Sequence, residues 1–190
     1  MLNIVISGGP GSGKGTQSDI LAETFHLKHL STGDLLRAEI AKGSELGQTA
    51  KSFIDKGNLV PDEMILALLA QAVDQASDAN GVIFDGYPRN VSQAAALDKL
   101  LADRGQQVTV MLDLVVPDEM LVERMLYRAK TSGRADDNPE TIKNRVKVYH
   151  EITAPVVEYY QKQGIYHGID GTKDIQNTSS LLKQQLEKFV

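Results

Sequence analysis

A glycine-rich segment near the N-terminus constrains the fold more than any other part of the sequence. Residues 8–16 read GGPGSGKGT; they follow a mostly apolar run, 2–6, and open a helical pattern over 14–25. Glycines let the backbone turn tightly and point N–H groups inward, while the helix N-terminus adds partial positive charge. The segment predicts a strand–loop–helix unit that binds phosphates. Lys14 would be a mobile cation for the outer phosphates, and the Thr16 hydroxyl would lie near a magnesium ion.

Apolar runs rich in β-branched residues alternate with helical patterns along the rest of the chain. Because none of these runs alternates between polar and apolar residues, each fits a strand that is covered on both faces. The predicted strands lie at 2–6, around His29-Leu30, and at 82–84, 108–116 and 165–169. The predicted helices cover 14–25, a stretch from Pro61 onward, 90–104, 117–129, 139–163 with a kink or break at Pro155, and 174–189. This alternation predicts an α/β fold with a five-stranded parallel sheet flanked by helices on both faces.

Two segments interrupt the alternation. Between Gly33 and Val60 the pattern indicates two short helices, with glycine stops at Gly43 and Gly57 and no strand between them. Residues 130–138 form a short polar loop. Binding and motion concentrate in such excursions from a core sheet. The length fits a single domain, 1–190, that contains a helical excursion over 31–60 and a short lid loop over 127–137.

Composition excludes several classes of protein. The formal net charge of −5 disfavours a general nucleic-acid binder, which usually carries a basic surface. No apolar run is long enough to span a membrane, and the N-terminus lacks a basic leader, so we expect a cytoplasmic protein. The chain has no cysteine, which rules out a disulfide framework and a thiolate zinc site.

Arginine is the scarcer cation, and most of the arginines fall in or beside the predicted loops. Arginine grips phosphate oxygens with two parallel hydrogen bonds and stays charged, which suits transfer between two phosphate-bearing substrates. The five arginines in these positions are Arg37, Arg89, Arg128, Arg134 and Arg145. For each of them the alternative is a solvated surface cation or a structural ion pair. Arg104 and Arg124 lie on amphipathic helices, and we expect each to be a surface cation or part of a structural ion pair.

The segment Asp85-Gly86-Tyr87-Pro88-Arg89 follows a predicted buried strand. Ligands of open parallel sheets bind at the carboxyl ends of the strands. Asp85 would therefore orient Mg²⁺ through water, and Arg89 would reach a phosphate. The alternative for Asp85 is a carboxylate that caps neighbouring backbone N–H groups.

Five segments, in this order and at this spacing, resemble the adenylate kinase family over essentially the whole chain. They are Gly8 to Gln17, Leu30 to Arg37, Gly57 to Pro61, Asp85 to Arg89 together with Gln93, and Ser132 to Asn138. The resemblance is to the short form, in which the lid is a small loop. The longer form has a larger lid that sometimes holds zinc through cysteines, and neither feature is present in this sequence.

The resemblance implies a role for each of a set of residues. ATP would be bound by Gly11, Ser12, Gly13, Lys14, Gly15, Thr16 and Arg128, with the main chain of Gly171 contacting its adenine. AMP would be bound by Thr32, Arg37, Asn58, Leu59, Val60, Gly86, Tyr87, Pro88, Arg89, Gln93, Arg134 and Arg145. The catalytic residues would be Lys14, Arg89, Arg128, Arg134 and Arg145. Asp136 and Asp137 would anchor the closed lid through ion pairs, the alternative being simple loop acids. Magnesium would arrive with ATP, without a direct protein ligand.

The implied activity is reversible phosphoryl transfer from Mg-ATP to AMP, which gives two ADP and serves adenine nucleotide homeostasis and salvage. The acceptor oxygen is already an anion, so no general base is needed. The four histidines, His26, His29, His150 and His167, lie outside the motifs, and we expect surface or packing roles for them. The resemblance also implies a monomer.

Three alternatives compete with this interpretation. A UMP/CMP kinase has the same shape but typically carries Ala in place of Thr32 and Asn in place of Gln93. A glutamine amide can pair with a purine edge as donor and acceptor, so both positions favour AMP, unless Gln93 is simply an exposed helix residue. A GTPase-like switch would show an Asn-Lys-x-Asp motif, which is absent. A non-catalytic nucleotide-binding module is disfavoured by the intact lysine and arginines.

Overall fold

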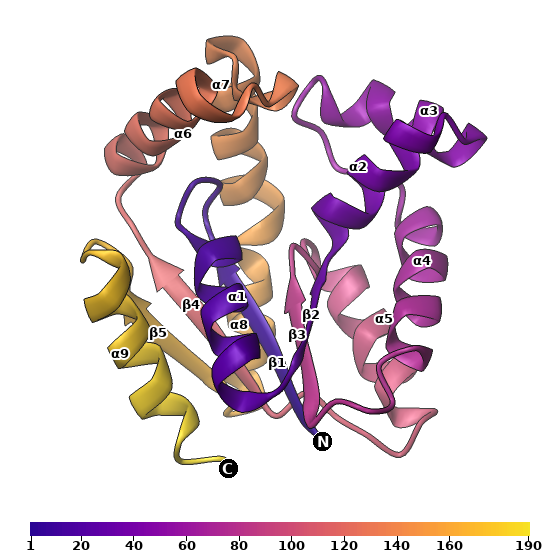
Figure 1. Ribbon diagram of the computed structural model, residues 1–190, viewed down its shortest axis with the longest axis vertical. Coiled ribbons are helices and arrows are strands. Elements are labelled where there is room, and N and C mark those ends of the chain that lie inside the picture. The colour runs from indigo at the N-terminus through magenta and orange to yellow at the C-terminus, as the bar shows by residue number, and fades with distance from the viewer.

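The computed structural model describes residues 1–190 and is built on a five-stranded parallel sheet (Figure 1). The order of the strands is β2-β3-β1-β4-β5. Their bounds are Leu2–Gly8 (β1), Lys28–Ser31 (β2), Gly81–Asp85 (β3), Val110–Val115 (β4) and Tyr166–Asp170 (β5). The predicted fold class is confirmed, since every neighbouring pair of strands is parallel.

Successive residues of β1 face two different hydrophobic cores. Ile4 and Ile6 belong to the cluster that contains Leu182 of α9, whereas Val5 belongs to the cluster that contains Leu97 of α5. Because side chains alternate along a strand, this division places helices on both faces of the sheet. One face is covered by α1 (Lys14–Phe25) and α9 (Ile175–Leu186), the other by α4 (Asp62–Asp74), α5 (Val91–Ala102) and α8 (Pro155–Lys162).

The excursion after β2 contains the two short helices that the sequence predicts. They are α2 (Thr32–Lys42) and α3 (Glu45–Ile54). Ser31 and Ser44 cap their N-termini by accepting hydrogen bonds from backbone N–H groups. Gly43 ends α2 with a φ of 68°, in the left-handed region that glycine adopts without strain.

The lid loop is shorter than predicted. Helix α6 (Asp118–Ser132) continues beyond residue 129, the expected end, and only a 3-10 turn at Ala135–Asp137 lies between it and α7 (Pro139–Val148). The hydroxyls of Thr131 and Ser132 fold back onto the last turn of α6 and donate to the carbonyl of Arg128 at 3.2 and 2.9 Å. The predicted interruption at Pro155 is confirmed, because a π-helical turn, Tyr149–Thr153, separates α7 from α8.

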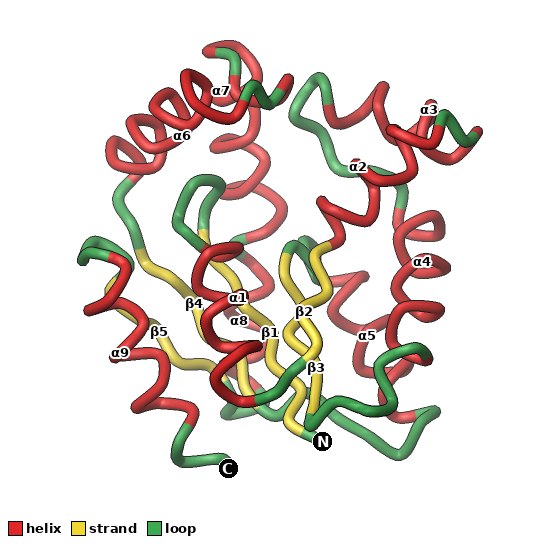
Figure 2. Tube along the Cα trace, viewed as in Figure 1, coloured by secondary structure: helices red, strands yellow, loops and turns green.

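Both excursions lie beyond the carboxyl ends of the strands. In Figure 1, α2 and α3 are on one side of this end of the sheet, and α6 and α7 are on the other. The loop that follows β1 and the loop before α4 point to the same end, as the tube in Figure 2 shows. None of the helices is both long enough and apolar enough to cross a membrane.

Replacing Leu112 of β4 with Ala should lower the free energy of unfolding by about 2–5 kcal/mol, because its side chain is fully buried and a cavity would remain. Leu112 pairs in register with Ile6, so the variant removes support from the strand that leads into the glycine-rich loop. Urea denaturation measures the change. Leu126→Ala is the matched control, since Leu126 is 39% exposed and should lose well under half as much. Equal losses would contradict this assignment of the core.

Candidate functional site

The glycine-rich loop joins β1 to α1 and presents unpaired N–H groups. Gly11 and Gly13 have φ values of 82° and 96°, which a residue with a side chain rarely adopts. Gly13 precedes α1 without a side-chain cap, and the N–H groups of Lys14, Gly15 and Thr16 have no acceptor within the chain. Unpaired donors at a helix N-terminus form a binding site for an anion.

Lys14 lies against the loop that it belongs to. Its Nζ donates to the carbonyl oxygens of Gly8 at 2.8 Å and Gly9 at 3.0 Å. Burial lowers the pKa of Lys14 to about 8, because it disfavours the charged ammonium, although the nearby Asp85 carboxylate opposes the shift. The ammonium is therefore poised to gain from an anion placed beside it.

Asp85 ends β3 and is hydrogen-bonded to a histidine that we expected only to pack. His29 Nε2 lies 3.1 Å from Asp85 Oδ2, and His29 Nδ1 lies 2.8 Å from Asp19 Oδ1. The expectation for His29 was wrong: it bridges two carboxylates. Burial would raise the pKa of Asp85, but His29 and Lys14 outweigh it and hold that pKa below its ordinary value. The capping alternative for Asp85 is not what the structure shows.

Most of the residues predicted to bind AMP line one cavity, the predicted acceptor-side cavity, which lies between the excursion and the sheet. Thr32 Oγ1 and Arg89 Nε donate to the carbonyl oxygen of Gly86 at 2.9 and 2.8 Å. The predicted residues that line the cavity are Thr32, Arg37, Asn58, Leu59, Val60, Gly86, Pro88, Arg89, Arg134 and Arg145.

Two predicted acceptor-side residues do not line this cavity. Tyr87 has its side chain buried in the hydrophobic core, and Gln93 is fully buried behind the cavity wall. The alternative of an exposed helix position for Gln93 is therefore wrong. Its amide instead contacts Arg89 and Asp62.

Two carboxylates of the predicted lid loop, Asp136 and Asp137, form ion pairs with three arginines. Asp137 Oδ2 and Oδ1 each lie 2.6 Å from a nitrogen of Arg128, and Arg145 donates to Asp137 Oδ1 at 3.0 Å. Arg134 contacts Asp136 through two hydrogen bonds of 2.9 and 2.8 Å. The side chain of Asp137 is fully buried. Both aspartates thus form the ion pairs that the sequence suggests, and the simple-loop alternative is wrong.

Lys14 and the five arginines predicted to lie in or beside loops converge on one cleft, although Arg37, Arg128 and Arg145 lie in helices. A second cavity, next to the acceptor-side one, is lined by all six cations together with residues 10–16 and Asp85. The six cations come from α1, α2, α6, α7, the loop after β3 and the lid loop. Burial lowers the pKa of Arg145 to about 10, and repulsion from its neighbouring arginines adds to the shift. A polyanion in this cleft would relieve that repulsion.

Arg124 has a role that the sequence analysis missed. Its guanidinium donates to the carbonyl of Ser12 at 3.2 Å and to that of Gly171 at 3.0 Å. It therefore ties the glycine-rich loop to the segment predicted to contact adenine. The available signal was its position four residues before Arg128, which places both on one side of α6. Arg104, by contrast, forms the expected surface pair, with Asp74.

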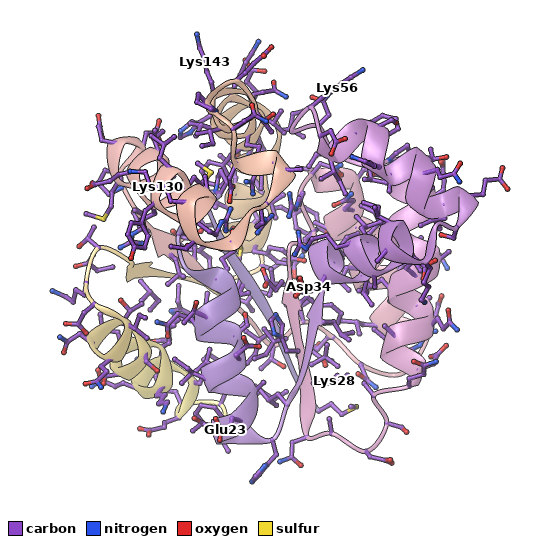
Figure 3. All side chains as sticks on the ribbon, turned by 45° about the horizontal axis from the view of Figure 1, so that its top comes forward. Glu23, Lys28, Asp34, Lys56, Lys130 and Lys143 are labelled. Atoms are coloured by element: carbon purple, nitrogen blue, oxygen red, sulfur yellow. The ribbon has the colours of Figure 1, made fainter.

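The excursion and the lid side touch each other. Thr141 Oγ1 donates to the carbonyl of Asp55 at 3.0 Å, and Asn144 Nδ2 donates to that of Lys56 at 2.6 Å. Figure 3 shows Lys56 and Lys143 extending away from the molecule at this rim. The excursion after β2 therefore meets α7 on one side of the cleft.

A parallel sheet, a glycine-rich loop at a helix N-terminus and a cleft of converging cations define a P-loop protein built to hold two phosphorylated ligands. Comparison with known proteins narrows this class. Residues 6–165 match the family model described as adenylate kinase. The adenylate kinase of Phocaeicola vulgatus is 58% identical over 90% of each chain. That of Flavobacterium psychrophilum is 47% identical over the full length of both chains, and that of Porphyromonas gingivalis is 46% identical over 100% of this chain and 97% of its own. The chain belongs to the adenylate kinase family.

The affinity for ATP should fall as the pH rises through about 8, because the ammonium of Lys14 loses its charge in that range. The sign follows from its lowered pKa: the group is charged below about 8 and neutral above it. Binding near that pH should also take up a proton, since phosphate favours the charged form. Calorimetry between pH 7 and 9.5, in buffers of different ionisation enthalpy, measures both effects. A Lys14→Ala variant that kept the same pH dependence would rule out this lysine as its source.

Proposed function

We propose that the chain transfers the terminal phosphoryl group of Mg-ATP to AMP within this cleft. Adenylate kinase activity, which converts ATP and AMP into two ADP, follows from the family to which the chain belongs. The assignment of the site rests on one observation: Lys14 and the five arginines at positions 37, 89, 128, 134 and 145 all line one cavity. That cavity adjoins the acceptor-side cavity, so the two cavities together would hold ATP and AMP side by side.

The chemistry needs charge compensation rather than a base. The attacking oxygen belongs to a phosphate that is already ionised, and the main obstacle is repulsion between two polyanions. The unpaired N–H groups that begin α1, together with Lys14 and Arg128, would hold the phosphates of ATP. Arg37 and Arg89 would hold the phosphate of AMP, and Arg134 and Arg145 would lie between the two.

Magnesium fits the oxygen atoms that surround the phosphate loop. Asp85 and Thr16 both line the cation-rich cavity and provide carboxylate and hydroxyl oxygens, the donors that this ion prefers. The ion would enter with ATP and be held by Asp85 through water, and there it would neutralise charge on the outer phosphates.

The lid carboxylates would hold the arginines in place before the substrates arrive. Asp136 and Asp137 keep three guanidinium groups paired and oriented next to the cleft. Phosphate oxygens can accept the remaining N–H groups of the same arginines without breaking these pairs. Pre-organised donors cost less reorganisation during transfer.

We further propose a cytoplasmic monomer in which two segments close over the substrates. Residues 31–60 would cover AMP and residues 127–137 would cover ATP. Closure would keep water out, because otherwise ATP would be hydrolysed. The position of both segments beyond the carboxyl ends of the strands supports this assignment.

With Mg-ATP as donor, AMP should exceed UMP, CMP and GMP in kcat/KM by about a hundredfold or more. ADP formation with each acceptor offered separately measures this. Lys14→Ala should lower turnover by about two to three orders of magnitude, because a cation that stabilises the transferred group is lost. Lys99→Ala, at an exposed lysine paired with Asp103, is the matched control and should leave turnover unchanged. Fast turnover with UMP or CMP would preserve the chemistry but overturn the assignment of Thr32 and Gln93.

Amide hydrogen exchange should slow separately in the two closing segments. AMP alone should protect residues 31–60, a non-hydrolysable ATP analogue should protect residues 127–137, and a bisubstrate analogue should protect both. The last turn of α9 serves as the internal control, because the helix runs away from the carboxyl ends of the strands (Figure 1). Identical exchange of both segments with and without the bisubstrate analogue would refute closure.

A further inference from the structure

The side-chain amide of Gln93 is held at both of its ends. Its Oε1 accepts a hydrogen bond from the backbone N–H of Arg89 at 2.7 Å, and its Nε2 donates to Asp62 Oδ1 at 2.8 Å. The residue has no exposed surface. The amide therefore has one preferred orientation, set by these two partners.

The same carboxylate oxygen orients a second amide. Asn90 Nδ2 donates to Asp62 Oδ1 at 3.1 Å, while Asn90 Oδ1 accepts from the backbone N–H of Gln93 at 2.8 Å and caps α5. A carboxylate only accepts and a backbone N–H only donates, so turning either amide over would place like groups together. Asp62 thus fixes the oxygen and nitrogen positions of both side chains.

This orientation leaves Gln93 with one free N–H and one free oxygen lone pair. Adenine offers the complementary pattern, with an acceptor at N1 and an amino donor at position 6. The 6-oxopurine of IMP or GMP offers the reverse, with a donor at N1 and an acceptor at position 6. An amide locked in one orientation can therefore match only one of the two kinds of base.

We propose that Asp62 is a positioning residue that sets the acceptor specificity, because it locks the Gln93 amide in the orientation that pairs with adenine and rejects 6-oxopurines. The inference rests on the proposed function, in which the base of AMP meets Gln93. Ile65, one turn after Asp62, and Pro88, next to Arg89, line the acceptor-side cavity, whereas Gln93 is buried and does not line it. The base of AMP must therefore displace part of this wall to reach the amide. Asp62 also begins α4, immediately after the segment proposed to close over AMP.

Asp62 has a second role that must be separated from the first. As an acid in the first turn of α4, it stabilises the helix N-terminus. Glu63 also lies in the first turn of α4, but it is exposed and makes no hydrogen bond to Gln93 or Asn90. Glu63→Gln is therefore a matched control that removes the same helix-end charge without touching the amide.

The test compares kcat/KM for AMP and for IMP, with Mg-ATP as donor, in the wild type and in three variants. In Asp62→Leu, which removes the acceptor, the ratio of AMP to IMP should fall by about tenfold, the effect of one hydrogen bond. The fall is not complete because the N–H of Arg89 still favours the original orientation. Asp62→Asn keeps an acceptor oxygen that can face the two amide N–H donors, so the ratio should stay close to the wild-type value there. Glu63→Gln should keep the wild-type ratio.

The change should appear mainly as a raised KM for AMP with kcat nearly preserved, since the phosphate-binding arginines are untouched. If Asp62→Leu does not fold, Asp62→Ala takes its place, because it also removes the acceptor oxygen. Equal losses for AMP and IMP in the variants would overturn the proposal, because a purely structural defect does not distinguish two bases. A wild type that does not use AMP would instead overturn the proposed function, so the two failures are distinguishable.

Discussion

Repulsion among six cations that share one cleft is the constraint on which the rest of this structure depends. Lys14 and five arginines converge there although the chain as a whole is acidic. The cluster is tolerated because four carboxylates stand among the cations: Asp85 beside Lys14, Asp34 beside Arg37, and Asp136 and Asp137 beside Arg128, Arg134 and Arg145. The lowered pKa values of Lys14 and Arg145 show that burial and repulsion are not fully offset. A polyanionic ligand would neutralise the remaining positive charge of the cleft. The contacts that bind the ligand would therefore also hold the cationic side chains in place.

The sheet is what makes this convergence possible. Its parallel strands all end at one edge, so the glycine-rich loop after β1 and the Asp85 segment after β3 are brought together. Ile6 pairs in register with Asp85, which places the carboxylate beside the strand that carries the phosphate loop. Arg89 comes from the loop after β3, whereas the other four arginines come from α2, α6, α7 and the turn between α6 and α7. The edge of the sheet thus supplies the phosphate-binding loop, and the surrounding helices supply most of the cations.

The sequence predicted the features that depend on local pattern. The strand–loop–helix unit at residues 8–16, the five strands and the helix break at Pro155 all follow from periodicity and from the backbone preferences of Gly and Pro. The bridging roles of His29 and Arg124 were not predicted, because each joins segments that are far apart along the chain. The end of α6 was also misplaced, because the polar composition of residues 130–132 is typical of a loop although these residues continue the helix.

The contact between the excursion and α7 limits how independently the two sides of the cleft can move. Gly57 has no space for a side chain, because a Cβ there would lie 2.8 Å from the side chain of Arg145. Arg145 in turn pairs with Asp137 in the lid turn. Any shift of this arginine toward a phosphate must therefore be accommodated both by the turn at Gly57 and by the lid carboxylate. The side chain of Arg145 thus contacts both Gly57 of the excursion and Asp137 of the lid turn, so the two sides of the cleft are linked through one guanidinium group.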